Sequence, residues 1–135
     1  MIVEILPTQY CAQNWDKVEH FIAEAHKWSG NDYSVEQIKM FVTLGQWALL
    51  VAYDDEKVIR GAATVSFVNY PNSRIAFITA IGGKLISSDE TFKQLVTIVK
   101  NAGATKIQGA ARKSIARLWR RFGFYERHTI VEIKI

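Results

Sequence analysis

The sequence predicts one α/β domain built on a mixed β-sheet, antiparallel at its start and parallel at its centre. Two observations carry this prediction: three apolar stretches joined by short turns, and a later strand–helix–strand unit. A chain of 135 residues suits a single domain spanning residues 1–135. Its 49% hydrophobic and 22% charged residues are typical of a globular protein and argue against a disordered or fibrous chain.

The first third of the chain predicts one strand and two helices. Residues 2–6 alternate like a strand and stop before a proline. The next apolar stripe has helical spacing and ends near residues 29–31. Ser34, with Gln37 three residues later, is the capping-box pattern of a second helix, which ends near Gly45. The stripe of the first helix consists of Trp15, Val18, Phe21, Ile22 and Ala25.

The middle of the chain predicts three strands linked as hairpins. Residues 47–53 form a continuous apolar run of strand length, and the polar residues 54–57 form a turn. Residues 58–69 return as a second strand. A further turn at 70–73 leads into a third strand at 74–82.

The last third predicts two helices that alternate with strands. A start signal at 87–90 opens a helix that closes near Gly103, and residues 106–111 form a short strand. A second apolar stripe of helical spacing ends at Gly123, and residues 129–135 alternate as a final strand. The predicted order is therefore β-α-α-β-β-β-α-β-α-β, with a right-handed parallel crossover in its second half.

Residue composition argues against several classes of protein. The single cysteine, Cys11, allows no intrachain disulfide and no thiol-rich metal site. The three histidines show no metal-ligand spacing. No basic leader precedes a long apolar run, and no stretch reaches the roughly 20 apolar residues of a membrane span. We expect a cytosolic type of compartment, without a metal and without membrane contact.

The net charge of +4 comes from one short segment. Residues 112–121 hold five basic residues and no acid, so the rest of the chain is close to neutral. Three interpretations stay open: a solvated helix face, a site for an anion or acidic partner protein, and weak salt-sensitive contact with nucleic acid. No recognised nucleic-acid module accompanies the segment. The candidate anion-binding or partner-binding residues are Lys113, Arg117, Arg120 and Arg121.

The element order and the C-terminal half resemble the GNAT superfamily of acyl-CoA N-acyltransferases. Residues 112–124, an arginine-rich helix closing on Phe122-Gly123-Phe124, are similar to the penultimate helix of that family. Residues 77–124 also resemble divergent GNAT-like proteins that bacteriophages encode, some of them near virion genes. The resemblance implies a GNAT-like α/β fold and a location in the host cytoplasm or in a virion.

The resemblance also implies an acetyl-CoA site between the strands at 74–82 and 106–111. In the family these strands splay, and strand backbone holds the pantetheine arm in the gap. The pyrophosphate meets the following loop and the start of the next helix. The implied acceptor is an amine of a small molecule or a protein. The implied cofactor-binding residues are Thr79, Ala80, Ile81, Gly82, Gly83, Lys84 and Ser88.

The expected phosphate loop departs from the family pattern. The family places a Gln or Arg, two residues, a Gly, one residue, and then a Gly or Ala. This chain places Gly82-Gly83-Lys84 directly after the strand, with Asp89 and Glu90 in the first turn of the next helix. Carboxylates there repel phosphate, so Ser88 can equally be an ordinary helix N-cap.

The residue types for acid–base chemistry are also unusual. The position of the family's usual tyrosine acid holds Trp119, whose indole N–H is too weak an acid. Tyr125 and Ser114 are weaker substitutes.

His20 and His26 lie six residues apart on the first helix, which does not place them on one face. Glu4, Glu24 and Asp32 could face a substrate cleft, but nothing in the spacing selects them as a base. The catalytic residues stay unknown.

Two functional hypotheses follow. The first is a divergent acetyl-CoA-dependent N-acyltransferase with a degraded phosphate loop. The second is a non-catalytic GNAT-fold component of a phage virion or its assembly, a pseudoenzyme that binds phage structural proteins through the arginine-rich helix. Trp28, at the end of the first helix, could anchor a substrate or partner if it is exposed.

Overall fold

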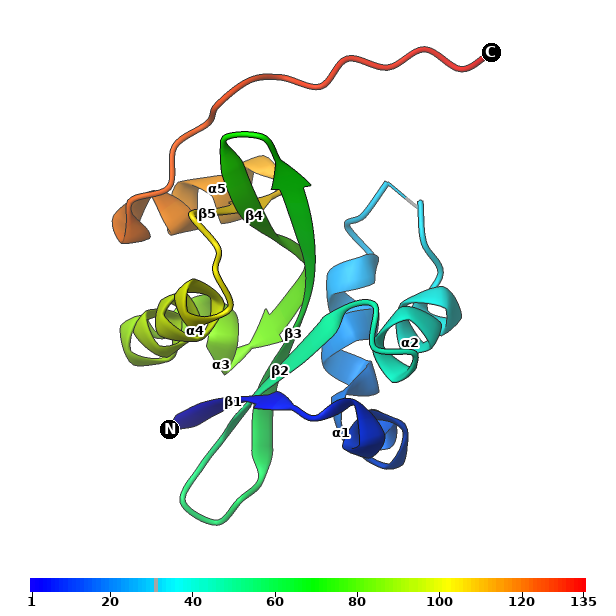
Figure 1. Cartoon of the computed structure of the whole chain (residues 1–135), viewed down its shortest axis with the longest axis vertical. Coiled ribbons are helices and arrows are strands. Elements are labelled where there is room, and N and C mark those ends of the chain that lie inside the picture. The colour runs from blue at the N-terminus through cyan, green and yellow to red at the C-terminus, as the bar shows by residue number, and fades with distance from the viewer. Residues whose placement is uncertain (31) are drawn as a thin grey trace.

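The chain folds as a five-stranded mixed sheet with helices on both faces (Figure 1). The computed structural model describes residues 1–30 and 32–135. The strand order is β1-β2-β3-β4-β5; neighbouring strands are antiparallel up to β4, and β5 is parallel to β4. In chain order the elements are β1 (Ile2–Leu6), α1 (Thr8–His26), α2 (Val35–Thr43), β2 (Ala48–Tyr53), β3 (Ile59–Tyr70), β4 (Ser73–Gly83), α3 (Lys84–Ser87), α4 (Asp89–Asn101), β5 (Lys106–Gly109), α5 (Lys113–Trp119) and the 3-10 turn η1 (Arg120–Phe122).

Two apolar layers sandwich the sheet. On one face, α1 and α2 pack on β2 and β3 through a cluster that includes Trp15, Val18, Ile22, Val42, Leu49 and Val51. On the other face, α3 and α4 pack through a cluster that includes Leu50, Ala52, Val65, Leu85, Leu95 and Val99. Successive residues of β2 alternate between the two clusters, because side chains along a strand point to opposite faces. This explains the continuous apolar run of that strand.

The predicted helix boundaries rest on side-chain caps that the structure confirms. Ser34 and Gln37 form the capping box of α2: the Ser34 hydroxyl accepts from the Gln37 N–H at 3.1 Å, and the Gln37 side chain accepts from the Ser34 N–H at 2.8 Å. Ser88 caps α4, and Gly103 takes φ +91° just after that helix ends.

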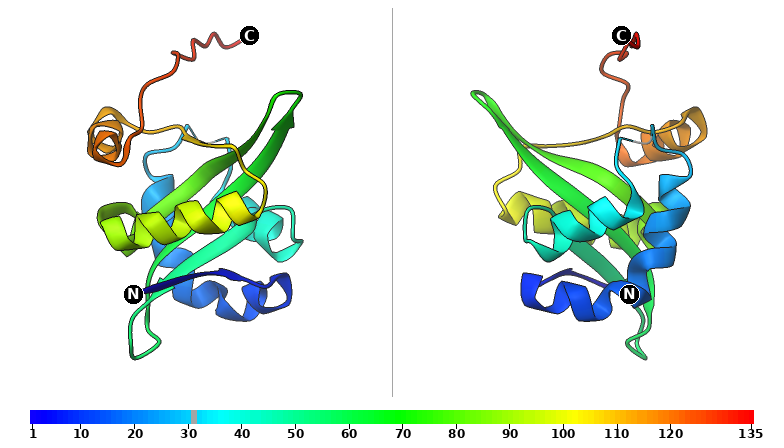
Figure 2. Two further views of the ribbon diagram at one scale, coloured as in Figure 1. Left: turned by 60° about the vertical axis from the view of Figure 1, so that its left-hand side comes forward. Right: turned by 90° about the vertical axis from the view of Figure 1, so that its right-hand side faces the viewer.

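The predicted final strand is wrong for this structure. Residues 129–135 form no strand and leave the body as an exposed extended segment (Figures 1 and 2). Alternation specifies which face of a strand is apolar, but a strand also needs a neighbouring edge to pair with.

Two smaller differences concern the neighbourhood of β4. The strand predicted at 106–111 ends at Gly109, because the chain turns away from β4 at that point. The loop expected after β4 contains the one-turn helix α3. Both differences lie where the resemblance implies a cofactor, so they shape the candidate site.

Candidate functional site

The strands β4 and β5 separate part-way along their length. Their parallel pairing runs from Ile75 with Lys106 to Ile78 with Gly109 and stops there. Beyond Ile78, β4 stays paired with β3 on its other side, whereas the chain after β5 moves away. Backbone N–H and C=O groups of β4 that point toward β5 therefore face a gap without a strand partner within the described residues. This is the splay that the resemblance implied.

A β-bulge lies at the point of separation. In the register between β3 and β4, Thr64 pairs with Ala80 and Val65 pairs with Ile78, so Thr79 is the extra residue. The Thr79 hydroxyl donates to the Thr64 carbonyl at 3.0 Å and lies 2.7 Å from the Thr64 hydroxyl. Thr64 is fully buried, so this pair fixes the bulge firmly. Bulges bend strands, and this one bends β4 where β5 departs.

The separation opens a cleft of about 510 Å³, within the usual range of small-molecule sites. Its walls come from α1, from β4, from residues 110–112 and from α5. Five of the seven predicted cofactor residues line it: Thr79, Ala80, Ile81, Gly82 and Gly83. Lys84 and Ser88 do not line the cleft.

The two glycines are required by packing. A Cβ on Gly82 would lie 2.9 Å from the Phe21 carbonyl oxygen of α1. Gly83 has φ +66° and ψ −144°, and a Cβ there would overlap the Arg60 carbonyl oxygen of β3. Gly82 and Gly83 thus let β4 approach α1 and β3, whatever contact they make with a ligand. The residues expected in a phosphate loop form a strand end and the one-turn helix α3.

The start of α4 carries two acids, and both are paired. The Glu90 carboxylate lies 3.2 Å from the N-terminal ammonium group of Met1. The Asp89 carboxylate lies 3.2 Å from the Arg121 guanidinium, which also donates to the Ser87 carbonyl at 2.9 Å. Arg121 therefore connects η1 to the start of α4 and offsets the charge of Asp89 beside the predicted phosphate position. The side chains of Arg121 and Asp89 are largely exposed, so the pair adds little stability, typically about 0–1 kcal/mol.

The arginine-rich helix is only partly free to bind an anion. Arg120 pairs with Glu126 at 3.2 Å, and Arg121 pairs with Asp89. Lys113 and Arg117 form no ion pair with any residue that the structure describes. These two exposed cations are the ones available to a further partner.

Two titratable residues of α1 line the cleft, and the sequence did not single them out. The His20 ring lies against that of Phe21, with centroids 3.8 Å apart and the planes tilted by 39°, and Glu24 accepts a hydrogen bond from Lys27 at 2.8 Å. They are four residues apart, a spacing that places two side chains on one helix face. That spacing, combined with the splayed strands opposite, is the signal that could have found them.

Two tryptophans line the cleft, one buried and the other exposed. Trp119 is 6% exposed and packs on Gly109, where an added Cβ would lie 2.9 Å from its ring. Trp28 is 61% exposed, as its helix-end position suggested, and the Arg112 guanidinium lies 4.0 Å above its ring. This pair joins α1 to the chain after β5 across the cleft. Tyr125 lines a different groove, so it does not replace the missing tyrosine acid.

Comparisons with known proteins match the structure but not the sequence. No protein-family model and no curated protein matches the chain. The ribosomal-protein-alanine N-acetyltransferase from Brucella melitensis biovar Abortus 2308 is similar over 100% of both chains, with a TM-score of 0.68 and 11% identity. A predicted acetyltransferase from Clostridium acetobutylicum, solved with acetyl-CoA, is similar over 98% of this chain and 95% of its own, with a TM-score of 0.67 and 14% identity. A tetramutant of the BH1408 protein from Bacillus halodurans is similar over 100% of both chains, with a TM-score of 0.70 and 14% identity.

The chain has the GNAT acetyltransferase fold. This confirms the predicted fold class, while identities of this size establish the fold alone. Within the described part of the chain, no helix is long and apolar enough to cross a membrane. The same residues contain no group of three or more histidine, cysteine or acidic side chains placed to hold a metal.

Proposed function

We propose that this protein is an acetyl-CoA-dependent N-acyltransferase that acts on a primary amine. The observation that carries the proposal is the separation of β4 from β5 beside a buried, hydrogen-bonded bulge. It leaves strand backbone facing a cleft of ligand size. A structure of the same fold holding acetyl-CoA supports the proposal.

The residues present suit the pantetheine arm better than the pyrophosphate. The arm carries amides, and the free backbone edge of Thr79–Ile81 offers the matching donors and acceptors. The phosphates would find no open glycine loop, because Gly82 and Gly83 are packed on α1 and β3. Arg121 of η1, which contacts Asp89 and the Ser87 carbonyl at the start of α4, is a cation that could take part of the phosphate charge.

The cleft also offers groups for the acceptor amine. In the reaction, the amine nitrogen forms a bond to the thioester carbonyl carbon, the C–S bond breaks with CoA leaving as its thiolate, and the amine loses a proton. We assign that proton to His20, since a neutral imidazole accepts protons near neutral pH. Glu24 lies on the same wall, where its carboxylate, which pairs with Lys27 in this structure, can attract the ammonium form of the acceptor.

Blocking the cleft without disturbing the fold tests this proposal. Ala111 is exposed and lines the cleft, so Ala111→Phe should fill it, and Ala12→Phe on the exposed face of α1 is the matched control. By calorimetry, we expect acetyl-CoA to bind the native protein and the control at micromolar levels. Ala111→Phe should bind at least about tenfold more weakly, a loss of about 1.4 kcal/mol. Absence of binding to the native protein at millimolar acetyl-CoA would refute the proposal.

The second hypothesis, a non-catalytic phage virion or assembly component, stays a prediction. Its binding surface was the arginine-rich helix, and two of the four residues predicted there are engaged in ion pairs within the chain. No observation of the described residues favours it over the cleft.

A further inference from the structure

Arg112 and Trp28 make a contact at the opening of the cleft. Trp28 follows the end of α1, and Arg112 directly precedes α5. Both residues line the cleft and both are exposed, so they lie where the cleft meets solvent. The Arg112 guanidinium lies 4.0 Å from the centre of the Trp28 ring, whose negative face attracts it. The contact therefore joins two walls of the cleft at its mouth.

The contact leaves the polar groups of Arg112 free to bind a ligand. Its side chain forms no hydrogen bond and no ion pair with any residue that the structure describes. Contact with an aromatic ring uses no hydrogen-bond acceptor, so the five N–H donors of the guanidinium stay available. Two of them match the two oxygens of a carboxylate. Because the Trp28 ring restrains the side chain, less entropy is lost when a carboxylate binds.

A negative group lies deeper along the same wall. The Glu24 side chain lines the cleft one helical turn before Trp28, a step of about 6 Å along the axis. Lys27, which pairs with Glu24 at 2.8 Å, does not itself line the cleft. An ammonium group is attracted toward Glu24 and a carboxylate toward Arg112, whereas the reverse orientation would bring like charges together. The cleft therefore favours a ligand with an amine at one end and a carboxylate farther along.

Arg112 lies away from the expected position of the phosphates of CoA. That position adjoins Gly82 and Gly83, and both glycines pack on Phe21 of α1. Trp28 comes seven residues after Phe21, which corresponds to about 10 Å along a helix. The guanidinium above Trp28 is therefore placed to meet the acceptor and not the pyrophosphate.

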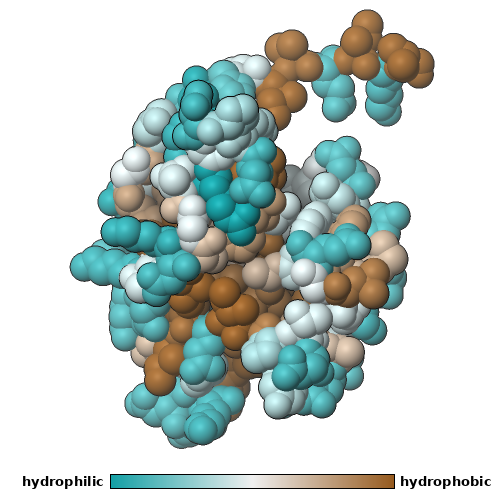
Figure 3. Space-filling model, in the orientation of Figure 1, coloured by the Kyte–Doolittle hydropathy of each residue, from teal (hydrophilic) through white to brown (hydrophobic). Residues whose placement is uncertain are grey.

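The size of the cleft limits how much of an acceptor it can hold. Its volume of about 510 Å³ has to accommodate the pantetheine arm as well as the acceptor amine, so the rest of the acceptor must pass through the mouth. The surface over α5, beside that mouth, is mainly hydrophilic (Figure 3). An extended peptide suits this opening, because its amine is at one end and its side chains follow at regular intervals.

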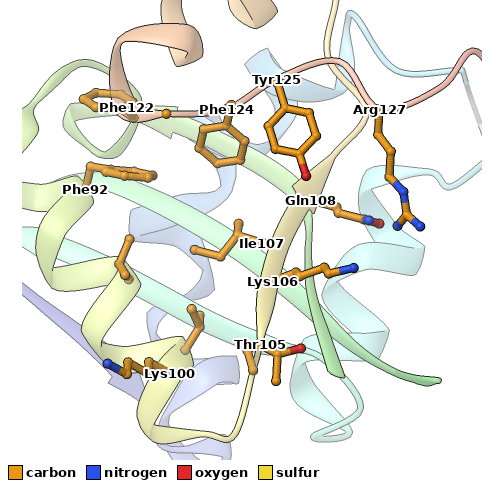
Figure 4. Close-up of a pocket in the computed structure, with 14 residues that line it drawn as sticks. Phe92, Lys100, Thr105, Lys106, Ile107, Gln108, Phe122, Phe124, Tyr125 and Arg127 are labelled. Atoms are coloured by element: carbon orange, nitrogen blue, oxygen red, sulfur yellow. The ribbon is translucent and has the colours of Figure 1, made fainter. Parts of the chain in front are cut away.

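The two charges act on this cleft and on no other hollow among the described residues. The hollow between β5 and α4 is lined by the rings of Phe92, Phe122 and Phe124 (Figure 4). Neither Glu24 nor Arg112 lines that hollow or the one between β5, the β3–β4 hairpin and α5.

We propose that the acceptor is the amino terminus of a polypeptide with an acidic side chain within its first four residues, and that Arg112, held by Trp28, binds that carboxylate. The inference rests on the proposed acetyl transfer. The terminal nitrogen forms the bond to the thioester carbonyl carbon, CoA leaves as its thiolate, and His20 takes the proton. Successive residues of an extended chain are about 3.3–3.6 Å apart, so a side chain a few residues from the amine spans the distance from Glu24 to Arg112.

Binding of matched peptides is the first test, and it needs no catalysis. Each peptide has a free amino terminus and an amidated carboxyl terminus, with either glutamate or glutamine at the second, third or fourth position. By calorimetry, we expect the glutamate peptide to bind about tenfold more tightly at the best position. Arg112→Gln should abolish this preference, and Arg112→Lys should restore only part of it, because an ammonium lacks the planar fork.

Lys113→Gln is the matched control for this test. It removes one positive charge at the next residue, but Lys113 lines a different hollow, so the preference for glutamate should remain. Arg112 and Lys113 are both exposed, and circular dichroism should show that both variants fold. Equal affinity of the native protein for both peptides at every position, or no binding of either at millimolar concentration, overturns the inference.

Acetyl transfer to the same peptides separates this inference from the proposed function. Arg112→Gln should raise KM for the glutamate peptide about tenfold while leaving kcat and the affinity for acetyl-CoA within about twofold. A loss of acetyl-CoA affinity instead would assign Arg112 to the phosphates, which overturns the inference and leaves the proposed function standing. A native protein that binds no acetyl-CoA refutes the proposed function, and the role of the peptide as acceptor falls with it.

Discussion

At the scale of single residues, the glycines beside the cleft show how backbone geometry limits the site. Gly83 has φ +66°, and a Cβ added there would overlap Gly61, Phe21 and the Arg60 carbonyl. Gly123 has φ +97°, but nothing lies within 4 Å of an added Cβ. Gly123→Ala should therefore lower the free energy of unfolding by about 1 kcal/mol through conformation alone. Gly83→Ala should cost about 3 kcal/mol or more, because overlap adds to strain. Chemical denaturation of both variants measures this, and equal losses would contradict it.

Protonation of Asp54 at low pH should destabilise the hairpin between β2 and β3. The Val58 N–H and the Arg60 side chain bond its carboxylate at 3.0 and 2.9 Å, and the Glu56 N–H bonds it at 3.0 Å. These contacts lower the pKa of Asp54 below its ordinary value of 3.8. A lowered folded-state pKa stabilises the protein above pH 3.8, and that stabilisation disappears as the pH falls through the folded-state value.

Asp54→Asn tests this linkage, because the amide oxygen still accepts hydrogen bonds but carries no charge. The native protein should be the more stable of the two near neutral pH, and the difference should shrink as the pH is lowered toward about 2. Urea denaturation across that range measures the difference. A constant difference would mean that the carboxylate charge is not what stabilises the turn.

His20 is the residue to which we assign the proton of the acceptor amine. His20→Gln should lower kcat for acetyl transfer by about 10²-fold or more while leaving acetyl-CoA affinity unchanged, since it removes only proton transfer. His128→Gln is the matched control, because His128 lies outside the cleft. Transfer to a panel of primary amines and peptides provides the assay. Full activity of His20→Gln would show that another group accepts the proton.

At the scale of elements, the bulge in β4 is the device that shapes the cleft. Thr79→Val keeps the shape of the side chain but removes both hydroxyl contacts with the buried Thr64, which should cost about 1–3 kcal/mol of stability. Acetyl-CoA binding should weaken as well, since the bend in β4 is less firmly held. Thr97→Val on α4 removes one exposed hydroxyl bond to the Lys93 carbonyl and should change neither property. A Thr79→Val protein with native stability and native acetyl-CoA affinity would show that the bend in β4 does not depend on the Thr79–Thr64 hydrogen bonds.

The elements also show what periodicity can and cannot predict. Apolar spacing located the helices α1, α2, α4 and α5, and the caps at Ser34 and Ser88 fixed where two of them begin. The bulge at Thr79 left no trace in the sequence, because it depends on register against β3 and on no local turn residue. Residues 129–135 alternate correctly and still form no strand, because pairing requires an edge that the sequence cannot place.

The same limit applies to the candidate site. The resemblance placed Thr79, Ala80 and Ile81 at the cleft, where they lie. The role of Gly82 and Gly83 in packing depends on the approach of α1 and β3, which no local pattern encodes. His20 and Glu24 become candidates only once α1 is seen to form the wall opposite β4.

At the scale of the whole molecule, the fold gathers the strand backbone of β4, the side chains of α1 and the chain after β5 around one cleft beside the sheet. Two apolar layers hold β2, β3 and β4 rigidly, while β5 is anchored by four residue pairs and then released. β4 supplies the backbone edge of the cleft, and the chain after β5 supplies the opposite wall.

The backbone of β4 beyond Ile78 is the central element of the proposed function, and its amides report on it directly. Nuclear magnetic resonance of the ¹⁵N-labelled protein during an acetyl-CoA titration measures them residue by residue. We predict that the amides of Thr79, Ala80 and Ile81 shift and become protected from hydrogen exchange, while those of the β2–β3 hairpin around Asp54 stay unchanged. Saturating acetyl-CoA that leaves the Thr79–Ile81 amides unshifted and freely exchanging would contradict it.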